Sequence, residues 1–384
     1  MGEGAMNVPI DAERGQKILY DCLSFPSPQP DAERVRAFIT QVVQPRLRTD
    51  LFDEVVLDGK GNLLARKRGK AGQKPFLVYT YAGTYPAESM ADPYPAQLLG
   101  EGPDLRLRGR GAAEQRSGLA AAIEAVNVYL AGRPVLSRGL DFVTNVAGEM
   151  GNHLVAAELV ETQGLVPHAV IIAVASDNEL CLGNLGRVDV HITIQGRSAH
   201  SSDPSAGVNA LEGARLLLNR LAALPMTRVD PELGRATLAP TFLETAPRAS
   251  HTIPSRATLT LDRRLLPGDE IPAVMADIEA CAQDLGKCQA EVVAGHFNYP
   301  NKVSPEAEIA RKTAEAMRSA GIDPNITYKR SALDGGYFTR SGADCVVFGP
   351  GDARLGHSDE EYVSVRQAVQ AAEVYRRLFA LVCE

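Results

Sequence analysis

Four polar segments of the chain each follow a predicted strand and carry side chains that could do chemistry. They combine carboxylate, imidazole, phenol and guanidinium groups with glycines, and they lie at residues 81–86, 109–118, 145–149 and 349–358. In an open α/β sheet the ligand site lies at the carboxyl ends of the strands, so polar residues just past those ends are expected to meet there. The sequence therefore predicts one ligand site built from four separate stretches of the chain.

The elements that must position these segments alternate between helix and strand. Apolar residues at helical spacing predict helices, and short apolar runs rich in β-branched residues predict strands. In order, the predicted elements are helices at 12–23 and 32–43, strands at 62–66 and 75–81, helix 117–130, strand 139–145, helix 151–162 and strand 169–174. Such alternation favours a largely parallel sheet covered by helices.

The pattern changes at Gly186, where a different order of elements begins. The sequence predicts strand, helix, strand, strand, helix and strand at 188–194, 209–223, 236–242, 257–262, 270–285 and 289–293. This βαββαβ order is typical of a small antiparallel sheet with two helices on one face. The first pattern then resumes with helix 305–320, strand 345–348 and helix 365–380.

We therefore predict two domains. Residues 1–186 and 299–384 form a discontinuous α/β domain with a mainly parallel sheet, and residues 187–298 form an inserted α+β domain. The boundaries of such predicted elements are good to about two to four residues.

Composition restricts the classes of partner. The chain has 384 residues, 45% of them hydrophobic, and a formal net charge of −7. No basic surface is expected that could neutralise a run of phosphates, so we predict small-molecule ligands and no nucleic acid. No apolar stretch approaches the roughly 20 residues that cross a bilayer, and the N-terminus lacks the pattern of a secretory signal. We expect a cytoplasmic protein that does not enter membranes.

The spacing of the cysteines indicates neither a disulfide framework nor a zinc knuckle. The six cysteines include no C-x-x-C pair: Cys22, Cys181, Cys281, Cys288, Cys345 and Cys383. Disulfide frameworks belong to small secreted chains, and zinc knuckles need closely spaced pairs. We expect reduced cysteines.

Six motifs occur in a fixed order. They read Tyr-Ala-Gly-Thr-Tyr-Pro at 81–86, Gly-Arg-Gly-Ala-Ala-Glu-Gln-Arg-Ser-Gly at 109–118, Gly-Glu at 148–149, Gly-Arg-Ser-Ala-His at 196–200 with Gly-Val-Asn-Ala at 207–210, Ile-Pro at 253–254 with Asp-Arg-Arg at 262–264, and Gly-Pro-Gly at 349–351 with His-Ser at 357–358. In type and order they resemble the motifs of the two-metal aminoacylase and carboxypeptidase family, which includes acetylornithine deacetylase, succinyl-diaminopimelate desuccinylase and glutamate carboxypeptidase. The resemblance covers nearly the whole chain and implies a metal-dependent amidohydrolase.

The resemblance implies one metal position with three ligands. Glu114 stands at the family's bridging carboxylate, Glu149 at the second Glu of its Glu-Glu pair, and His357 at its late histidine. Two carboxylates and an imidazole suit zinc, manganese or a similar divalent ion. Glu114 is one methylene longer than the Asp of the family. We expect one divalent ion, zinc or manganese.

The family's second metal position is altered. Tyr81 stands where its first histidine belongs, and Gly83 stands where the adjacent Asp belongs. Neutral tyrosine, with a pKa near 10, replaces imidazole poorly. The third ligand stays open, because an ungapped reading gives Val174 while a short gap admits Asp177 or Glu179. We do not expect a second ion.

The family's general base is also missing. Gly148 falls where the first Glu of the pair takes a proton from metal-bound water, and a positioned acid–base group is worth about 10² to 10⁴ in rate. A single ion can still lower the pKa of its bound water towards about 7, so hydrolysis is weakened without being excluded. Tyr81 is the side chain that could serve instead as hydrogen-bond donor or acid.

The predicted insertion keeps more of the family's residues. His200 matches a histidine that reaches the neighbouring active site across a dimer, and Arg264 matches the arginine that binds the substrate carboxylate. His251 stands where the family usually has Asn, and Asn209 lies in the Gly-Val-Asn-Ala motif; both are predicted substrate-binding residues. The resemblance therefore implies a homodimer and a small carboxylate-bearing ligand.

Two functions remain open. The residues at Glu114, Glu149, His357 and Arg264 favour a hydrolase with altered acid–base chemistry. The absence of a general base at Gly148 favours a non-catalytic homologue that binds a small carboxylate or serves as an oligomeric partner.

Overall fold

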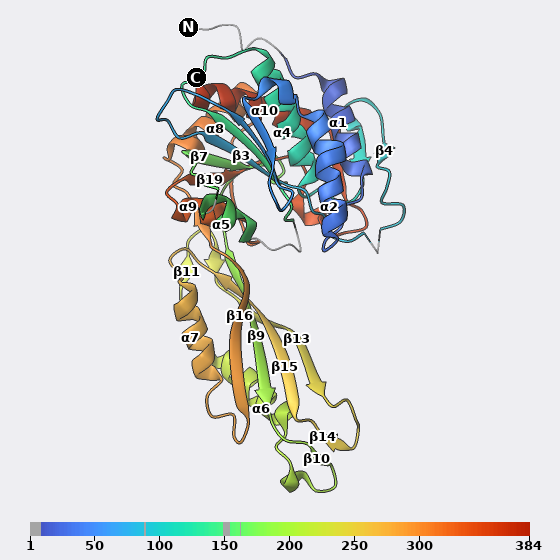
Figure 1. Cartoon of the computed structure of the whole chain (residues 1–384), viewed down its shortest axis with the longest axis vertical. Helices are drawn as coiled ribbons and strands as arrows, with labels where there is room; N and C mark the ends of the chain where they lie inside the picture. The colour runs from blue at the N-terminus through green and yellow to red at the C-terminus, as the bar shows by residue number, and fades with distance from the viewer. Residues whose placement is uncertain (1–8, 88–89, 149–153, 162) are drawn as a thin grey trace. The chain divides into compact units, whose positions relative to one another are not determined.

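The computed structural model of the chain describes residues 9–87, 90–148, 154–161 and 163–384 and divides into two compact units (Figure 1). The first unit comprises Met1–Gly183, Lys302–Tyr328 and Gly335–Glu384, and the second comprises Asn184–Asn301 and Lys329–Asp334. Each unit has its own sheet and its own hydrophobic core. The second unit is thus an insertion into the chain of the first.

A sheet of nine strands forms the centre of the first unit. The strand order is β1-β2-β6-β3-β7-β19-β8-β17, and β18 also pairs with β8. The strands are β1 (Glu54–Leu57), β2 (Leu63–Lys67), β3 (Phe76–Tyr81), β6 (Leu140–Asn145), β7 (Ala169–Ile172), β8 (Leu180–Asn184), β17 (Asn301–Lys302), β18 (Ile326–Lys329) and β19 (Asp344–Val347). Strands β6, β3, β7 and β19 are parallel neighbours, whereas β1, β2 and β8 pair antiparallel. The predicted α/β class is confirmed, and the sheet is mixed rather than mainly parallel.

The helices of the first unit contribute much of its hydrophobic core. They are α1 (Ala12–Ser24), α2 (Ala32–Phe38), the π-helical turn η1 (Ile39–Val43), α3 (Gln44–Arg46), η2 (Thr49–Leu51), α4 (Arg116–Ala131), α5 (Leu154–Glu161), α8 (Glu308–Ser319), α9 (Gly335–Arg340) and α10 (Val365–Cys383). Helix α4 is buried over nearly its whole length and packs against α1 and α10, which suits its Ala-rich sequence. Helix α1 starts where Asp11 accepts a hydrogen bond from the Arg14 N–H, at 3.0 Å.

A small three-stranded sheet lies beside two of the predicted site segments. Strand β5 (Arg106–Arg108) pairs with both β4 (Gln97–Leu99) and β20 (Tyr362–Ser364). The short helices η3 (Gly102–Asp104) and η5 (Ala353–Leu355) lie in the same loops. Pairing of β5 with β20 brings the start of the 109–118 segment next to the end of the segment that contains His357.

The second unit has the predicted βαββαβ order. An antiparallel sheet in the order β13-β15-β9-β16 is formed by β9 (Gly186–Gln195), β13 (Leu238–Ala246), β15 (Arg256–Leu265) and β16 (Gln289–Asn298). Alternate residues of β9 and β15 pack with α6 (Ala210–Ala223) and α7 (Ile271–Cys281) in one core (Figure 1). The short elements are β10 (Ala199–His200), η4 (Pro204–Ala206), β11 (Val229–Asp230), β12 (Gly234–Arg235) and β14 (Thr252–Ile253).

Two smaller expectations can be compared with the structure. None of the helices in the described ranges combines the length and the apolar character that crossing a membrane needs. All six cysteines are free thiols, as predicted, and burial raises the pKa of Cys22 and of Cys383 to about 12.

Candidate metal and substrate site

Two of the predicted metal ligands meet directly. Glu114 lies in the turn before α4 with 8% of its surface exposed, and its Oε1 is 2.6 Å from Nε2 of His357. The imidazole is half exposed and stacks on the ring of Tyr85, with centroids 4.0 Å apart and planes at 10°. Three of the four polar segments predicted to form one site therefore contribute side chains to the same place.

A buried ion pair, Arg110–Glu361, supports the turn that carries Glu114. Oε2 of Glu361 lies 2.9 Å from Nη1 of Arg110, and its Oε1 accepts a hydrogen bond from the N–H of Ala113 at 2.9 Å. Both charged side chains are fully buried. Burial raises the pKa of Glu361, while the N–H groups of Ala113 and Gly111 and the guanidinium of Arg110 favour its charged form. Glu361 thus fixes the turn that carries Glu114.

Sequence reasoning missed Glu361 and Tyr85. Glu361 lies four residues beyond His357 in a stretch of three acidic residues, which is usually read as a solvated surface. Tyr85 lies inside the first polar segment, but nothing in its spacing indicates a stacking partner. The only signal was their closeness in sequence to two of the motifs.

The third predicted ligand, Glu149, lies outside the described residues. Within the ranges that the structure describes, no three His, Cys, Asp or Glu side chains gather as a metal site would require. Glu114 and His357 supply one oxygen and one nitrogen donor side by side, which fits half of the predicted ligand set for zinc or manganese.

The residues predicted to stand at the family's second metal position are closely packed. Tyr81 ends β3 with only 3% of its surface exposed, and its ring packs edge-on against Tyr79 with centroids 5.3 Å apart. Next to it, Gln29 fills the space beside Gly83, because a Cβ on this glycine would lie 2.7 Å from Cγ of Gln29. Gln29 is itself buried. The place of the family's His and Asp is therefore taken by an aromatic ring and an amide.

Gly148 has no room for a side chain. A Cβ on this residue would lie 2.6 Å from the carbonyl carbon and 2.8 Å from Cα of Gly83. Gly83 is held there because its N–H donates to the carbonyl of Ala147, at 3.0 Å, and because Nε2 of Gln115 donates to its carbonyl. The backbone of one predicted site segment thus lies where the general base of the family would stand.

Asp177, the doubtful second ligand, is engaged elsewhere. Its Oδ1 accepts a hydrogen bond from Nε2 of Gln367 at 2.6 Å, and its N–H donates to the carbonyl of Gly351 at 2.8 Å. It adopts a positive φ of 59°. Val174, the alternative from an ungapped reading, is a buried apolar residue. Among the described residues, neither joins Glu114 in a group of metal-binding side chains.

In the second unit, pairing of β10 with β14 brings two predicted site residues together. His200 lies opposite Thr252, and the rings of His200 and His251 are 5.8 Å apart. Both histidines are exposed, and Nδ1 of His200 is 2.8 Å from the hydroxyl of Ser202. Two imidazoles at the surface of one unit suit a role towards another molecule.

Arg264 and Asn209 occupy different positions in the same unit. Arg264 lies eight residues beyond Arg256 on β15, a distance of about 26 Å along a strand. Its guanidinium binds Asp262 through two contacts of 2.8 and 2.9 Å. Asn209 caps α6, since its Oδ1 accepts a hydrogen bond from the N–H of Leu211 at 3.0 Å. Within one chain, Arg264 is therefore far from the start of β15, where His251 precedes the strand.

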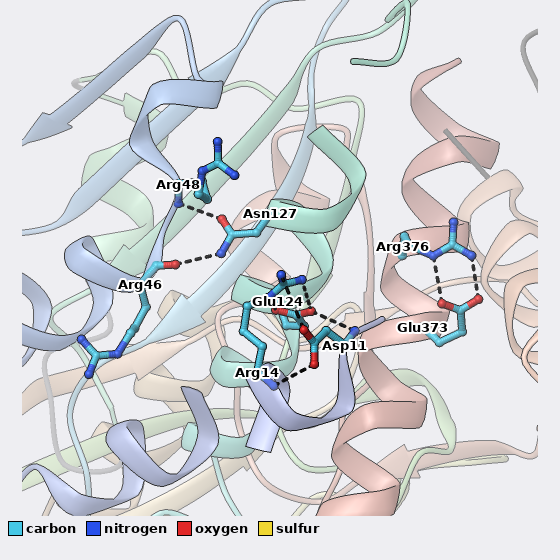
Figure 2. Close-up of polar contacts among 8 residues, drawn as sticks. All are labelled: Asp11, Arg14, Arg46, Arg48, Glu124, Asn127, Glu373 and Arg376. Atoms are coloured by element: carbon cyan, nitrogen blue, oxygen red, sulfur yellow. Dashed lines mark hydrogen bonds and ion pairs between the residues drawn. The ribbon is translucent and has the colours of Figure 1, made fainter. Parts of the chain in front are cut away.

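A cavity of about 480 Å³ lies elsewhere in the first unit. Basic and apolar side chains of α1, α3 and α4 line it, among them Arg14, Lys17 and Arg46. Figure 2 shows that the neighbouring charges are paired: Arg14 donates to the buried carboxylate of Glu124 at 2.6 and 2.7 Å. None of the predicted site residues lines this cavity.

Comparison with known proteins identifies the relatives of this chain. The model of the M20 peptidase dimerisation domain matches residues 182–290, which include strands β9, β13 and β15 of the second unit. An acetylornithine deacetylase of Myxococcus xanthus is 27% identical over 95% of both chains, and a succinyl-diaminopimelate desuccinylase of Burkholderia multivorans is 24% identical over 88% of this chain and 92% of its own. The chain is thus similar to enzymes of the aminoacylase and carboxypeptidase family over nearly its whole length. The predicted relationship is confirmed.

Other relatives extend the comparison. A putative [LysW]-lysine/[LysW]-ornithine hydrolase of Aeropyrum pernix is 28% identical over 72% of this chain and 74% of its own length. The M20 metallo-carboxypeptidase Sso-CP2 of Sulfolobus solfataricus superposes with a TM-score of 0.77 at 17% identity, covering 96% of this chain and 98% of the other. This likeness shows the shared fold. The relatives of the family are hydrolases, which supports the predicted class of metal-dependent hydrolase.

Proposed function

We propose that this chain is a one-metal amidohydrolase that acts on a small amide bearing a carboxylate. The observation that carries the proposal is the contact between Glu114 and His357, 2.6 Å apart in a turn fixed by the buried Arg110–Glu361 pair. A carboxylate and an imidazole held this closely suit a shared divalent ion. Glu149 is the proposed third ligand.

The residues around this pair have separate tasks in the proposed reaction. A bound zinc or manganese ion would lower the pKa of its bound water. Tyr85 keeps the imidazole of His357 in one orientation by stacking, and Glu361 keeps Glu114 in place through the turn at 109–114. Tyr81, at the carboxyl end of β3, is the proposed hydrogen-bond donor to the substrate. Because Gly148 supplies no base, we expect slower turnover than in family members that have one.

The proposed assembly is a homodimer formed through the second unit. This unit matches a dimerisation domain, and its edge strand β13 exposes Phe242 and Leu243. An unpaired edge strand is a natural site for association between identical chains. We propose that His200 and His251 of one chain serve the site of its partner, and that Arg264 binds the substrate carboxylate.

One observation favours a second function. The backbone of Gly83 lies against Gly148 and excludes a side chain there, which suits a homologue that binds a small carboxylate without hydrolysing it. In that case the Glu114–His357 pair would hold a metal or ligand, and no amide would be cleaved.

The two functions differ in one experiment. The chain is purified without chelator, its metal content is measured, and N-acetyl and N-succinyl amino acids are tested with added zinc or manganese. The first proposal predicts turnover that His357→Ala abolishes and that His168→Ala, at a distant surface pair with Glu308, leaves unchanged. Binding of these compounds without turnover would support the second function, and neither binding nor turnover would contradict both.

A further inference from the structure

Buried arginines in this chain are normally paired with carboxylates. Arg376 is 3% exposed in its side chain and donates to Glu373 at 2.6 and 2.9 Å, as Figure 2 shows. Arg110, which is also buried, binds the buried Glu361 at 2.9 Å. Arg116 is different, because it is fully buried and makes no ion pair within the described parts of the chain.

The contacts of Arg116 leave part of its guanidinium unused. Nη2 donates to the hydroxyl of Ser27, and the guanidinium carbon lies 3.1 Å from the centre of the Phe38 ring. Nε and Nη1 have no hydrogen-bond partner among the residues described. A guanidinium stays charged in a protein, and a buried charge without a counter-charge is costly.

Three further residues with unused donors lie nearby: Arg110, Thr84 and Tyr94. Nε and Nη2 of Arg110 have no acceptor in the described structure, and neither do the buried hydroxyls of Thr84 and Tyr94. Arg116 and Thr84 meet across Gly111, since a Cβ there would lie 2.6 Å from Cγ of Arg116 and 3.1 Å from Cγ2 of Thr84.

Tyr94 joins the two arginines. Burial raises the pKa of its phenol, while the Thr84 hydroxyl, Arg116 and Arg110 act on it in the opposite direction. Its hydroxyl therefore lies within electrostatic reach of both guanidinium groups. Two cations, two hydroxyls and the carboxylate of Glu361 thus lie in one buried region of the described structure.

Among the described residues, the charges of this region do not balance. Arg110 and Glu361 neutralise each other, whereas Arg116 has no ion-pair partner in the described parts of the chain. Water could accept hydrogen bonds from these donors, but it carries no charge that would offset that of Arg116. The unused donor atoms are each buried, so a ligand among them would have to be small. We propose that Arg110, Arg116, Thr84 and Tyr94 form a buried site for a small monovalent anion of the halide class.

This anion would act on the neighbouring turn. Arg110 and Glu361 are bonded to each other, and Glu361 also binds the N–H of Ala113, next to Glu114. An anion that offsets the charge of Arg116 would therefore stabilise the turn that carries Glu114, the proposed metal ligand. The anion proposal is tested apart from the function of the chain, because its readout is stability in chloride and not turnover, although Arg110 also belongs to the pair that fixes the turn of Glu114.

The first test is thermal unfolding as a function of chloride. The full chain, Arg116→Met and the control Arg376→Met are dialysed into sodium gluconate and titrated with sodium chloride at constant ionic strength. At saturating chloride we expect the midpoint of the wild-type chain to rise by on the order of 3 °C. Arg116→Met should not respond, because its apolar side chain removes the charge, and Arg376→Met should unfold earlier yet keep the full response.

A milder variant and a direct observation complete the test. Tyr94→Phe removes one donor and should require about tenfold more chloride for the same rise in midpoint. Crystals grown in bromide should show an anomalous peak between Arg110 and Arg116. A wild-type midpoint that is the same in gluconate and chloride, an Arg116→Met response equal to that of the wild type, or water in place of the bromide peak would each overturn the proposal.

Discussion

The two halves of the predicted metal centre differ in their packing. On one side, Glu114 and His357 are in contact, and a buried ion pair and a stacked tyrosine hold them. On the other side, Tyr81, Gly83 and Gly148 stand where the resemblance predicts ligands and a base, and a buried amide and a neighbouring backbone fill the space.

The difference shows that the altered half is a packed structure and not an empty site. If ligands had simply been lost, the positions of Gly83 and Gly148 would border open space. Instead, a Cβ added at either glycine would meet other atoms closer than ordinary van der Waals contact. The altered half has therefore been rebuilt around its new residues, and replacing one of them should not restore the original chemistry.

The largest effect is expected at Gly148. The side chain of Gly148→Glu would enter the backbone of Gly83 and bury a charge, so we expect a loss of about 4 kcal/mol or more in the free energy of unfolding. No amidase activity should be gained. Chemical denaturation measures the loss, and Gly59→Ala, whose Cβ meets nothing within 4 Å, is the control. A soluble Gly148→Glu protein of wild-type stability with a hundredfold higher amidase rate would show that the base is merely missing.

The intact half should depend on Glu361. Glu361→Gln leaves the charge of Arg110 buried without its partner, and breaking a buried pair in this way costs about 3–5 kcal/mol. Glu212→Gln, which breaks an exposed pair with Arg215, should cost less than about 1 kcal/mol. Urea unfolding of both variants compares them. Equal and small losses would mean that Glu361 does not hold the turn that carries Glu114.

A smaller effect tests the packing between Gln29 and Gly83. Gly83→Ala alone should cost about 1–3 kcal/mol, because its Cβ would meet the side chain of Gln29. In the background of Gln29→Ala most of this cost should disappear, which gives a coupling energy of about 1–2 kcal/mol in a double-mutant cycle. Additive losses would show that Gln29 does not fill this space.

The sequence predicted the intact half better than the altered half. Glu114 and His357 carry recognisable side chains within ordered motifs, so their meeting could be expected. A glycine shows only that a side chain is absent, and nothing in the sequence indicates that Gly83 and Gly148 would lie against each other. Glu361 was missed for a related reason, because its burial arises from the pairing of β5 with β20, two strands of three residues each.

The fold was predictable to a similar degree. The parallel strands β3, β6, β7 and β19 are continuous buried runs, which the pattern identifies, and the long strands and helices of the second unit follow clear periods. Strands β1 and β8 were not predicted. They are short and pair antiparallel at the margins of the sheet, where tertiary contacts rather than local pattern decide the structure.

The most direct test of this account is the number of metal ions per chain. Protein purified without chelator and loaded with zinc or manganese should retain one ion per chain by elemental analysis after extensive dialysis. His357→Ala should retain none, and Asp177→Asn, which alters a residue bound to Gln367, should still retain one. Two tightly held ions per chain, or loss of an ion in Asp177→Asn, would contradict the conclusion that only one half of the centre is intact.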